Sequence, residues 1–146
     1  MINIQKIFSI ILISIFIFGY QSLINVSTAQ LITVHLGEPF KLKINQEALI
    51  MPENINIKFS TVEEDSRCPL DTQCVWPGQV NIVVNIINQN QNLGAFNLIS
   101  RLGEKNIQYF DNYGVELIKV TPWPQKNERL EMSDYQAILV VNEFTL

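Results

Sequence analysis

The chain has few of the residue types from which most catalytic and metal sites are built. Its 146 residues include one histidine, His35, and two cysteines. There is no zinc-binding motif, no glycine-rich phosphate loop and no carboxylate pair whose spacing indicates acid–base catalysis. His35 lies between Val34 and Leu36 in a stretch typical of a strand, where a lone histidine is more often structural than catalytic. We therefore expect no catalytic residue, no cofactor and no enzymatic activity.

Positive charge is the second shortage. Ten lysine and arginine residues are outnumbered by fourteen aspartate and glutamate residues, which gives a net charge of −4 at pH 7. No cluster of three or more basic residues interrupts this acidic excess. Because nucleic acids and anionic membranes bind basic patches, neither is expected as a partner.

The first thirty residues contain no acidic side chain and have the order of an export signal. Met1–Lys6 is a short amino-terminal region, residues 7–18 are almost entirely apolar, and Ser27–Ala29 places small residues before a cut at Gln30. This order is typical of a secretory signal peptide. A membrane-spanning helix needs about 20 apolar residues, which is more than this run provides. The alternative is that the segment stays uncleaved and anchors the protein as an amino-terminal helix.

We expect residues 1–29 to be the signal peptide and residues 30–146 to form a single domain. That length is sufficient to bury one core. The domain is expected to be secreted or periplasmic, to keep no stable membrane span after cleavage, and to be a monomer.

The apolar residues after the signal come in short runs and alternate with polar ones. This period of two is typical of strands, and no long stretch has helical spacing. Turn residues separate the runs, so we expect an all-β fold: a single antiparallel β-sandwich or barrel-like domain of about seven to nine short strands. The expected strands are 31–36, 40–44, 48–51, 55–62, 79–87, 93–99, 107–110, 115–120 and 135–141.

One stretch, Glu63–Gly78, concentrates the unusual residues of the chain. It contains both cysteines, two of the six prolines and four acidic residues. In an exported chain the simplest interpretation of Cys68 and Cys74 is a disulfide. Closing so short a ring contributes about 2 kcal/mol on the chain-entropy estimate, so the bridge is expected to shape a loop. A metal site is the weaker interpretation, because there is no second cysteine pair and no nearby histidine.

The same stretch carries the sequence Asp-Ser-Arg-Cys-Pro-x4-Cys-x-Trp-x-Gly over Asp65–Gly78. In this it resembles a family of small bacterial exported proteins and lipoproteins with that signature. The resemblance implies an exported, β-rich domain and no particular activity. Two features depart from the family pattern: Pro77 stands where a small residue is expected, and the lipoprotein cysteine of many members is absent.

Charged residues of this stretch have two interpretations. Arg67 can present a cationic fork to a carboxylate or phosphate, or it can pair with a nearby acid such as Asp65 and fix the loop. The local excess of acid favours the second. As weak calcium candidates the stretch offers only carboxylates, without an Asp-x-Asp-x-Asp-Gly loop. These candidates are Glu63, Glu64, Asp65 and Asp71.

The two tryptophans are further binding candidates. Trp76 follows Cys74 by two residues and is expected to pack on the disulfide rather than to form a ligand platform. Trp123 lies between two prolines. With Tyr109, Tyr113 and Tyr135 it could form a surface for carbohydrate or peptide, although we favour a role in covering one open end of the domain.

Three functional hypotheses remain open. The first is a secreted, non-enzymatic β-sandwich that binds an unknown protein or carbohydrate, or acts as an accessory domain. The second is a protease inhibitor in which the 68–74 ring presents Leu70 to an enzyme, since a rigid loop lowers the cost of binding. The third is a calcium-dependent adhesion or carbohydrate-binding module that uses the acidic rim of the loop.

Overall fold

A computed structural model describes residues 31–144. The expected signal peptide, residues 1–29, lies outside these residues. Within 31–144 the chain forms no helix that is both long enough and apolar enough to cross a membrane.

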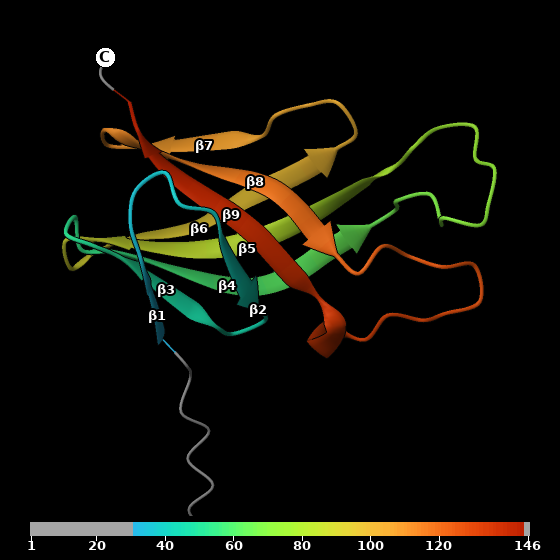
Figure 1. Cartoon of the computed structure of the whole chain (residues 1–146), viewed down its shortest axis with the longest axis horizontal. Helices are drawn as coiled ribbons and strands as arrows, with labels where there is room; N and C mark the ends of the chain where they lie inside the picture. Colours follow the sequence, from blue (N-terminus) through green and yellow to red (C-terminus); the bar gives the residue numbers. More distant parts are fainter. Residues whose placement is uncertain (1–30, 145–146) are drawn as a thin grey trace, which may run out of the picture.

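The described chain forms two β-sheets that pack face to face (Figure 1). The neighbours within each sheet are antiparallel, except that β1 and β3 are parallel. The predicted all-β sandwich is therefore confirmed. The first sheet has the order β1 (Leu31–Val34), β3 (Glu47–Ile50), β4 (Ile55–Asp65), β5 (Gln79–Asn88) and β6 (Gln91–Arg101); the second has β2 (Phe40–Lys43), β9 (Gln136–Glu143), β8 (Tyr113–Thr121) and β7 (Ile107–Phe110).

Period-two alternation explains how the sheets pack. In β4 the side chains of Ile55, Ile57 and Phe59 point inward and are fully buried, while the residues between them are only partly buried. Leu42 and Leu139 meet them from the second sheet, in one continuous core. Removing this apolar surface from water is the main force that holds the sheets together.

Several strands differ from their predicted bounds. The β5–β6 hairpin closes through only two residues, Gln89 and Asn90, whose φ angles are 48° and 69°. Positive φ at both central residues gives the tight turn whose twist matches that of paired strands. The strands therefore extend into the polar stretch 88–92, which the sequence suggested was a longer turn. At the other extreme, β1 ends at Val34, so His35 lies in the turn that follows it.

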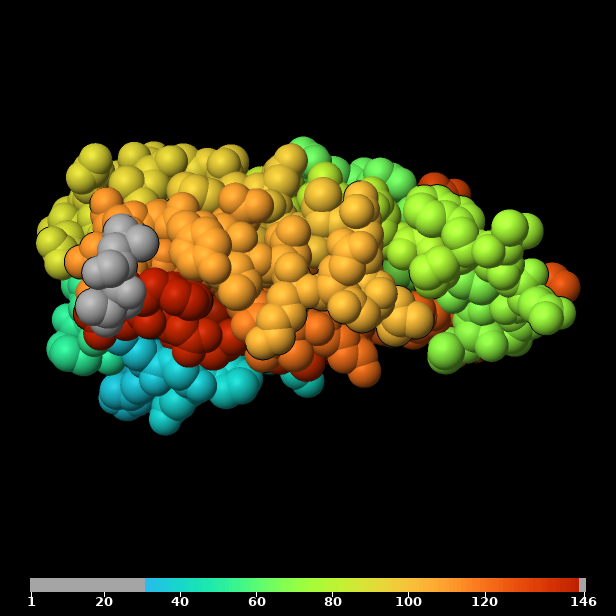
Figure 2. Space-filling model, turned by 90° about the horizontal axis from the view of Figure 1, so that it is seen from above, coloured from blue at the N-terminus to red at the C-terminus, as the bar shows by residue number. Residues whose placement is uncertain are grey.

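The two ends of the sandwich differ (Figure 1). One end carries tight turns, among them 89–90 and 111–112. The other carries three longer connections, residues 66–78, 102–106 and 122–135, and we call it the loop end. Figure 2 shows that the 66–78 connection, which we call the disulfide loop, projects beyond the body of the molecule.

Candidate functional site at the disulfide loop

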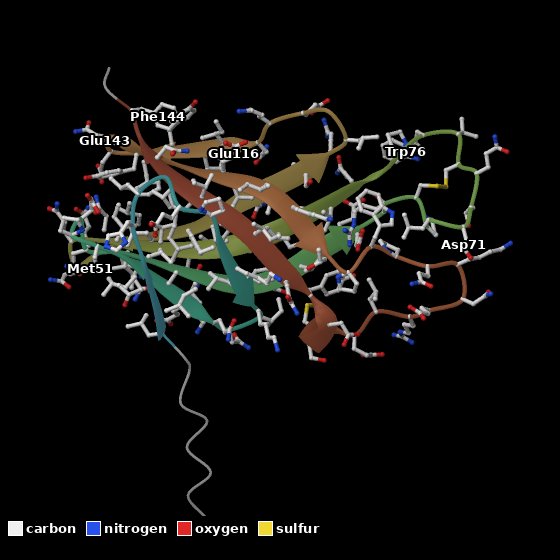
Figure 3. All side chains as sticks on the ribbon, in the orientation of Figure 1. Met51, Asp71, Trp76, Glu116, Glu143 and Phe144 are labelled. Carbon is white, nitrogen blue, oxygen red and sulfur yellow. A yellow bond between two sulfur atoms is a disulfide. The ribbon has the colours of Figure 1, made fainter. Side chains whose placement is uncertain are left out.

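The two cysteines form the predicted disulfide. Cys68 and Cys74 are joined within the disulfide loop, and their Cα atoms are 6.0 Å apart. Both sulfur atoms are used in the bridge, so neither is a thiolate ligand for a metal. Figure 3 shows the bridge inside the projecting loop, with Trp76 and Asp71 on that loop.

Arg67 lies at the base of the loop and is only 5% exposed. Its Nε donates to Asp65 Oδ1 at 2.7 Å and its Nη2 to Asp65 Oδ2 at 2.5 Å, a two-pronged ion pair. Nη1 donates to the carbonyl of Val120 at 2.7 Å, and Nη2 also donates to that of Pro122 at 3.0 Å. A charge this buried is tolerated when it is paired and hydrogen-bonded. Arg67 thus ties the disulfide loop to the chain that leaves β8 in the other sheet.

Trp123 completes the base from the same segment. The guanidinium carbon of Arg67 lies 5.0 Å from the centre of the indole ring, a cation–π contact. The indole Nε1 donates to the carbonyl of Cys68 at 2.7 Å. Trp123 is half-buried, and its contact with the backbone of the disulfide loop was not foreseen from the sequence.

Tyr135 holds the carboxylate of Asp65 from the opposite side. Its hydroxyl donates to Asp65 Oδ2 at 3.1 Å, and its side chain is buried. Burial, followed by the charge of Asp65 and this hydrogen bond, raises the pKa of Tyr135 to about 12. The phenol therefore stays protonated near neutral pH and keeps donating to Asp65.

Backbone hydrogen bonds fix the rest of the loop. Cys68 N donates to the carbonyl of Pro77 at 2.9 Å, across the loop itself. Leu70 N donates to the carbonyl of Pro124 at 3.1 Å, and Lys126 N donates to Asp71 Oδ1 at 2.9 Å. The loop is thus held by the neighbouring 122–135 connection as well as by its disulfide.

Gly78, which ends the signature, is required by the geometry where the loop rejoins β5. Its φ angle is +72°, a region that residues with a Cβ rarely adopt. A Cβ at this position would lie 1.8 Å from the carbonyl oxygen of Ser66. Only glycine allows the two strands of the loop to approach this closely.

The outer part of the loop exposes large apolar side chains. Leu70 is 72% exposed, Trp76 is 61% exposed and Val75 is fully exposed. We call these three residues the apolar tip. Trp76 was expected to pack on the bridge, and its side chain is mostly exposed. Scattered exposed apolar residues are ordinary, but three on one anchored loop make it a candidate contact surface.

The acidic candidates do not gather into a metal site. Glu63 accepts from Asn81 at 2.9 Å, Asp65 is held by Arg67, and Asp71 accepts the amide of Lys126. Within residues 31–144, no group of three or more histidine, cysteine or acidic side chains is arranged to hold a metal. The four calcium candidates are therefore not gathered into a site.

The predicted aromatic surface is not formed either. Tyr109 and Tyr113 flank the tight turn between β7 and β8, at the end of the sandwich remote from Trp123. Tyr109 packs edge-on against Phe144 there, with ring centres 5.0 Å apart. His35 is exposed, and its Nδ1 lies 3.3 Å from Glu38 Oε2.

A cleft of about 270 Å³ at the loop end was not foreseen from the sequence. It lies between the end of β6 and the end of β8, and Arg67 and Trp123 contribute to its lining. Arg101, Leu102 and Lys119 also line it. No spacing in the chain relates these residues, because their proximity depends on how the two sheets pack.

The loop end thus combines a fixed base, an exposed apolar tip and an adjacent cleft. Comparisons of this chain with protein-family models, with curated proteins and with solved structures found no match. A function is therefore inferred from the geometry of the loop end.

Proposed function

We propose that this chain is an exported, non-enzymatic binding module that engages a protein partner through the apolar tip. The observation that carries the proposal is the contrast within one loop: Leu70, Val75 and Trp76 are exposed, while the backbone beneath them is fixed. A few residues supply most of the energy at protein interfaces, and tryptophan is among the types enriched there. A loop already held in one conformation loses little entropy when it binds.

Export is supported by three features. The disulfide is of a kind that persists in oxidising compartments, which is compatible with an extracellular location. The order of residues 1–29 is that of a signal peptide, and the signature in Asp65–Gly78 resembles that of bacterial exported proteins. We accordingly propose a secreted or periplasmic protein, with an uncleaved amino-terminal anchor as the alternative.

We propose no catalytic role because the polar groups of the loop end are already engaged in contacts within the protein. The carboxylate of Asp65 accepts hydrogen bonds from Arg67 and Tyr135, so it is not free to act as a base. His35 follows β1 at the other end of the sandwich, exposed beside Glu38. General acid–base catalysis needs such groups within hydrogen-bond reach of a shared substrate, and these two lie at opposite ends.

Photo-crosslinking tests the proposal. Trp76 is replaced by benzoylphenylalanine, and the same substitution at Asn85, which is exposed on β5 in the sheet, serves as the matched control. Cells or membranes of the source are exposed to each protein and irradiated. We expect one discrete protein adduct from position 76 that unlabelled wild-type protein displaces and the Trp76→Ser variant does not. Equal adducts from both positions, or equal displacement by Trp76→Ser, would overturn the proposal.

A protease inhibitor is the second candidate, and one observation favours it. Leu70 is 72% exposed while its own amide is fixed to the carbonyl of Pro124, so its side chain is presented from a constrained backbone. A panel of serine and cysteine proteases tests this candidate. Inhibition that is lost in Leu70→Gly and kept in Trp76→Ser would establish it, and no inhibition at micromolar protein would eliminate it. Calcium-dependent adhesion and carbohydrate binding have less support, since neither the carboxylates nor the aromatic residues are gathered.

A further inference from the structure

We infer that the cleft beside the disulfide loop binds the carboxyl terminus of a peptide, taking its carboxylate together with an apolar last side chain. The inference rests on the proposed function, because it takes the loop end to be the binding surface and names the chemistry of what is bound there. Three observations carry it: the charge of the cleft, an unused buried donor and an apolar wall.

The charge of the cleft is opposite to that of the whole chain. The cleft is lined by three basic residues, Arg67, Arg101 and Lys119, and by one acidic residue, Glu104. The chain as a whole carries a net charge of −4. Even when the Asp65 carboxylate that pairs with Arg67 is included, the basic groups exceed the acidic ones by one. A locally positive hollow in an acidic protein selects an anion by charge complementarity.

The two outer cations remain able to bind a ligand. Lys119 is exposed, and no carboxylate in residues 31–144 lies within ion-pair distance of its ammonium group. Arg101 uses Nε on Gln79, at 2.6 Å, and its Nη1 lies only within a loose 3.7 Å of Glu104. Its side chain is 49% exposed, so its outer N–H groups can turn toward the cleft.

Arg67, which contributes to the lining of the cleft, has one N–H group that no hydrogen bond among the described residues uses. A guanidinium has five N–H groups. Four hydrogen bonds occupy four of them: Nε and one N–H of Nη2 on Asp65, the other N–H of Nη2 on Pro122, and one N–H of Nη1 on Val120. The second N–H of Nη1 has no partner among the described residues. A buried donor left without a partner is unfavourable, so an acceptor in the cleft is stabilised there.

The apolar wall of the cleft favours a ligand that has an apolar side chain beside its carboxylate. Leu102 is 77% exposed and Ile118 is 46% exposed, and both line the cleft beside the half-buried ring of Trp123. A carboxylate alone would leave this surface in water. Figures 1 and 2 show that the disulfide loop and the 102–106 connection neighbour each other at this end. A partner whose chain ends in the cleft would therefore also reach the apolar tip.

Labelled hexapeptides test the inference. One set ends in Leu, Phe or Ala with a free carboxylate, a second set has the same sequences as amides, and a third is amidated but carries an internal glutamate. Binding is measured by fluorescence anisotropy at low salt. We expect the free acids ending in Leu or Phe to bind at least tenfold more tightly than their amides. Equal binding of acid and amide, or of the internal-glutamate set, would overturn the inference.

Variants then localise the binding. Lys119→Glu should weaken binding of the free-acid peptides at least tenfold, while Lys41→Glu, the same charge change on the exposed face of β2, should leave it unchanged. Equal loss in both variants would show only a general charge effect and would reject the cleft. Trp76→Ser should bind the peptides unchanged but fail to displace the adduct that forms from benzoylphenylalanine at position 76. Failure of the cleft and failure of the apolar tip are thereby distinguished.

Discussion

The base and the tip of the disulfide loop differ in what their large side chains contact. At the base, Arg67 and Trp123 are fixed by hydrogen bonds to the backbone of a neighbouring segment. At the tip, Leu70 and Trp76 lie mostly in solvent. The contrast is clearest for the two tryptophans, because one forms contacts that fix the loop and the other is exposed on it. The disulfide loop is thus fixed at both ends of Asp65–Gly78, while large side chains between these ends are exposed.

Removing Asp65 should give the largest effect, because it leaves Arg67 buried without its counter-charge. Asp65→Ala is expected to lower the free energy of unfolding by about 3 to 5 kcal/mol. Denaturant unfolding of wild type and variant measures the change. A double variant, Asp65→Ala with Arg67→Met, should recover part of the loss. If the single variant unfolds like wild type, the ion pair does not hold the base.

A methyl group at Gly78 should come next. Gly78→Ala is expected to destabilise the protein by about 2 to 3 kcal/mol, because the Cβ meets the Ser66 carbonyl and φ is positive. Gly103→Ala is the matched control: its φ is also positive, at +83°, but nothing lies within 4 Å of the added Cβ. The control should lose only about 1 kcal/mol. Equal losses would show that crowding at Gly78 is unimportant.

Loss of the disulfide should have a moderate effect on stability. Replacing both Cys68 and Cys74 by serine removes the disulfide and is expected to lower the free energy of unfolding by about 2 kcal/mol. The sandwich should stay folded, since its core lies between the sheets and away from the bridge. Circular dichroism and thermal unfolding measure both points. Global unfolding of this variant would show that the loop holds the whole domain together.

The tryptophan pair tests the comparison itself. Trp123→Phe removes the hydrogen bond to the Cys68 carbonyl and weakens the contact with Arg67, and it should cost about 1 to 2 kcal/mol. Trp76→Phe should change the free energy of unfolding by less than about 0.5 kcal/mol, as surface substitutions usually do. The reverse order in denaturant unfolding would contradict the assignment of base and tip.

Alkaline pH should produce the most specific effect. The pKa of Tyr135 is raised from 10.0 to about 12 in the folded protein, so the folded state binds this proton more tightly than the unfolded state. The resulting stability is fully present below pH 10 and is lost as pH rises from 10 to 12. Tyr135→Phe should remove this part of the pH dependence, measured by unfolding at several alkaline pH values. If the free energy of unfolding of Tyr135→Phe depends on alkaline pH as that of wild type does, the Tyr135 phenol does not contribute to this dependence.

Local regularities made much of the fold predictable. The alternation in Ile55–Phe59 depends only on neighbours in the chain, and it correctly indicated the buried face of β4. The stretch 79–87 was expected to be covered on both faces, but only the face of Val80, Ile82, Val84 and Ile86 is fully buried. The parallel pairing of β1 with β3 could not be foreseen, since it depends on which sheet edge is free. The two-residue turn at Gln89 and Asn90 was missed because neither residue is glycine.

The site was predictable only where its residues are close in sequence. Asp65 and Arg67 are two residues apart, and the local excess of acid indicated their pairing. The partners from the other sheet, the carbonyls of Val120 and Pro122 and the ring of Trp123, follow more than fifty residues later. Their approach depends on how the two sheets pack, so the contacts of Trp123 with the disulfide loop were not foreseen from the sequence.

The most direct test of the central claim compares affinity with stability in one variant. The protein captured from position 76 is purified, and its binding to wild type and to Trp76→Ser is measured alongside the unfolding midpoint of each. We predict at least tenfold weaker binding for Trp76→Ser with an unchanged midpoint, because the tip contacts the partner and not the fold. Unchanged affinity in Trp76→Ser would contradict the assignment of the apolar tip as the binding surface.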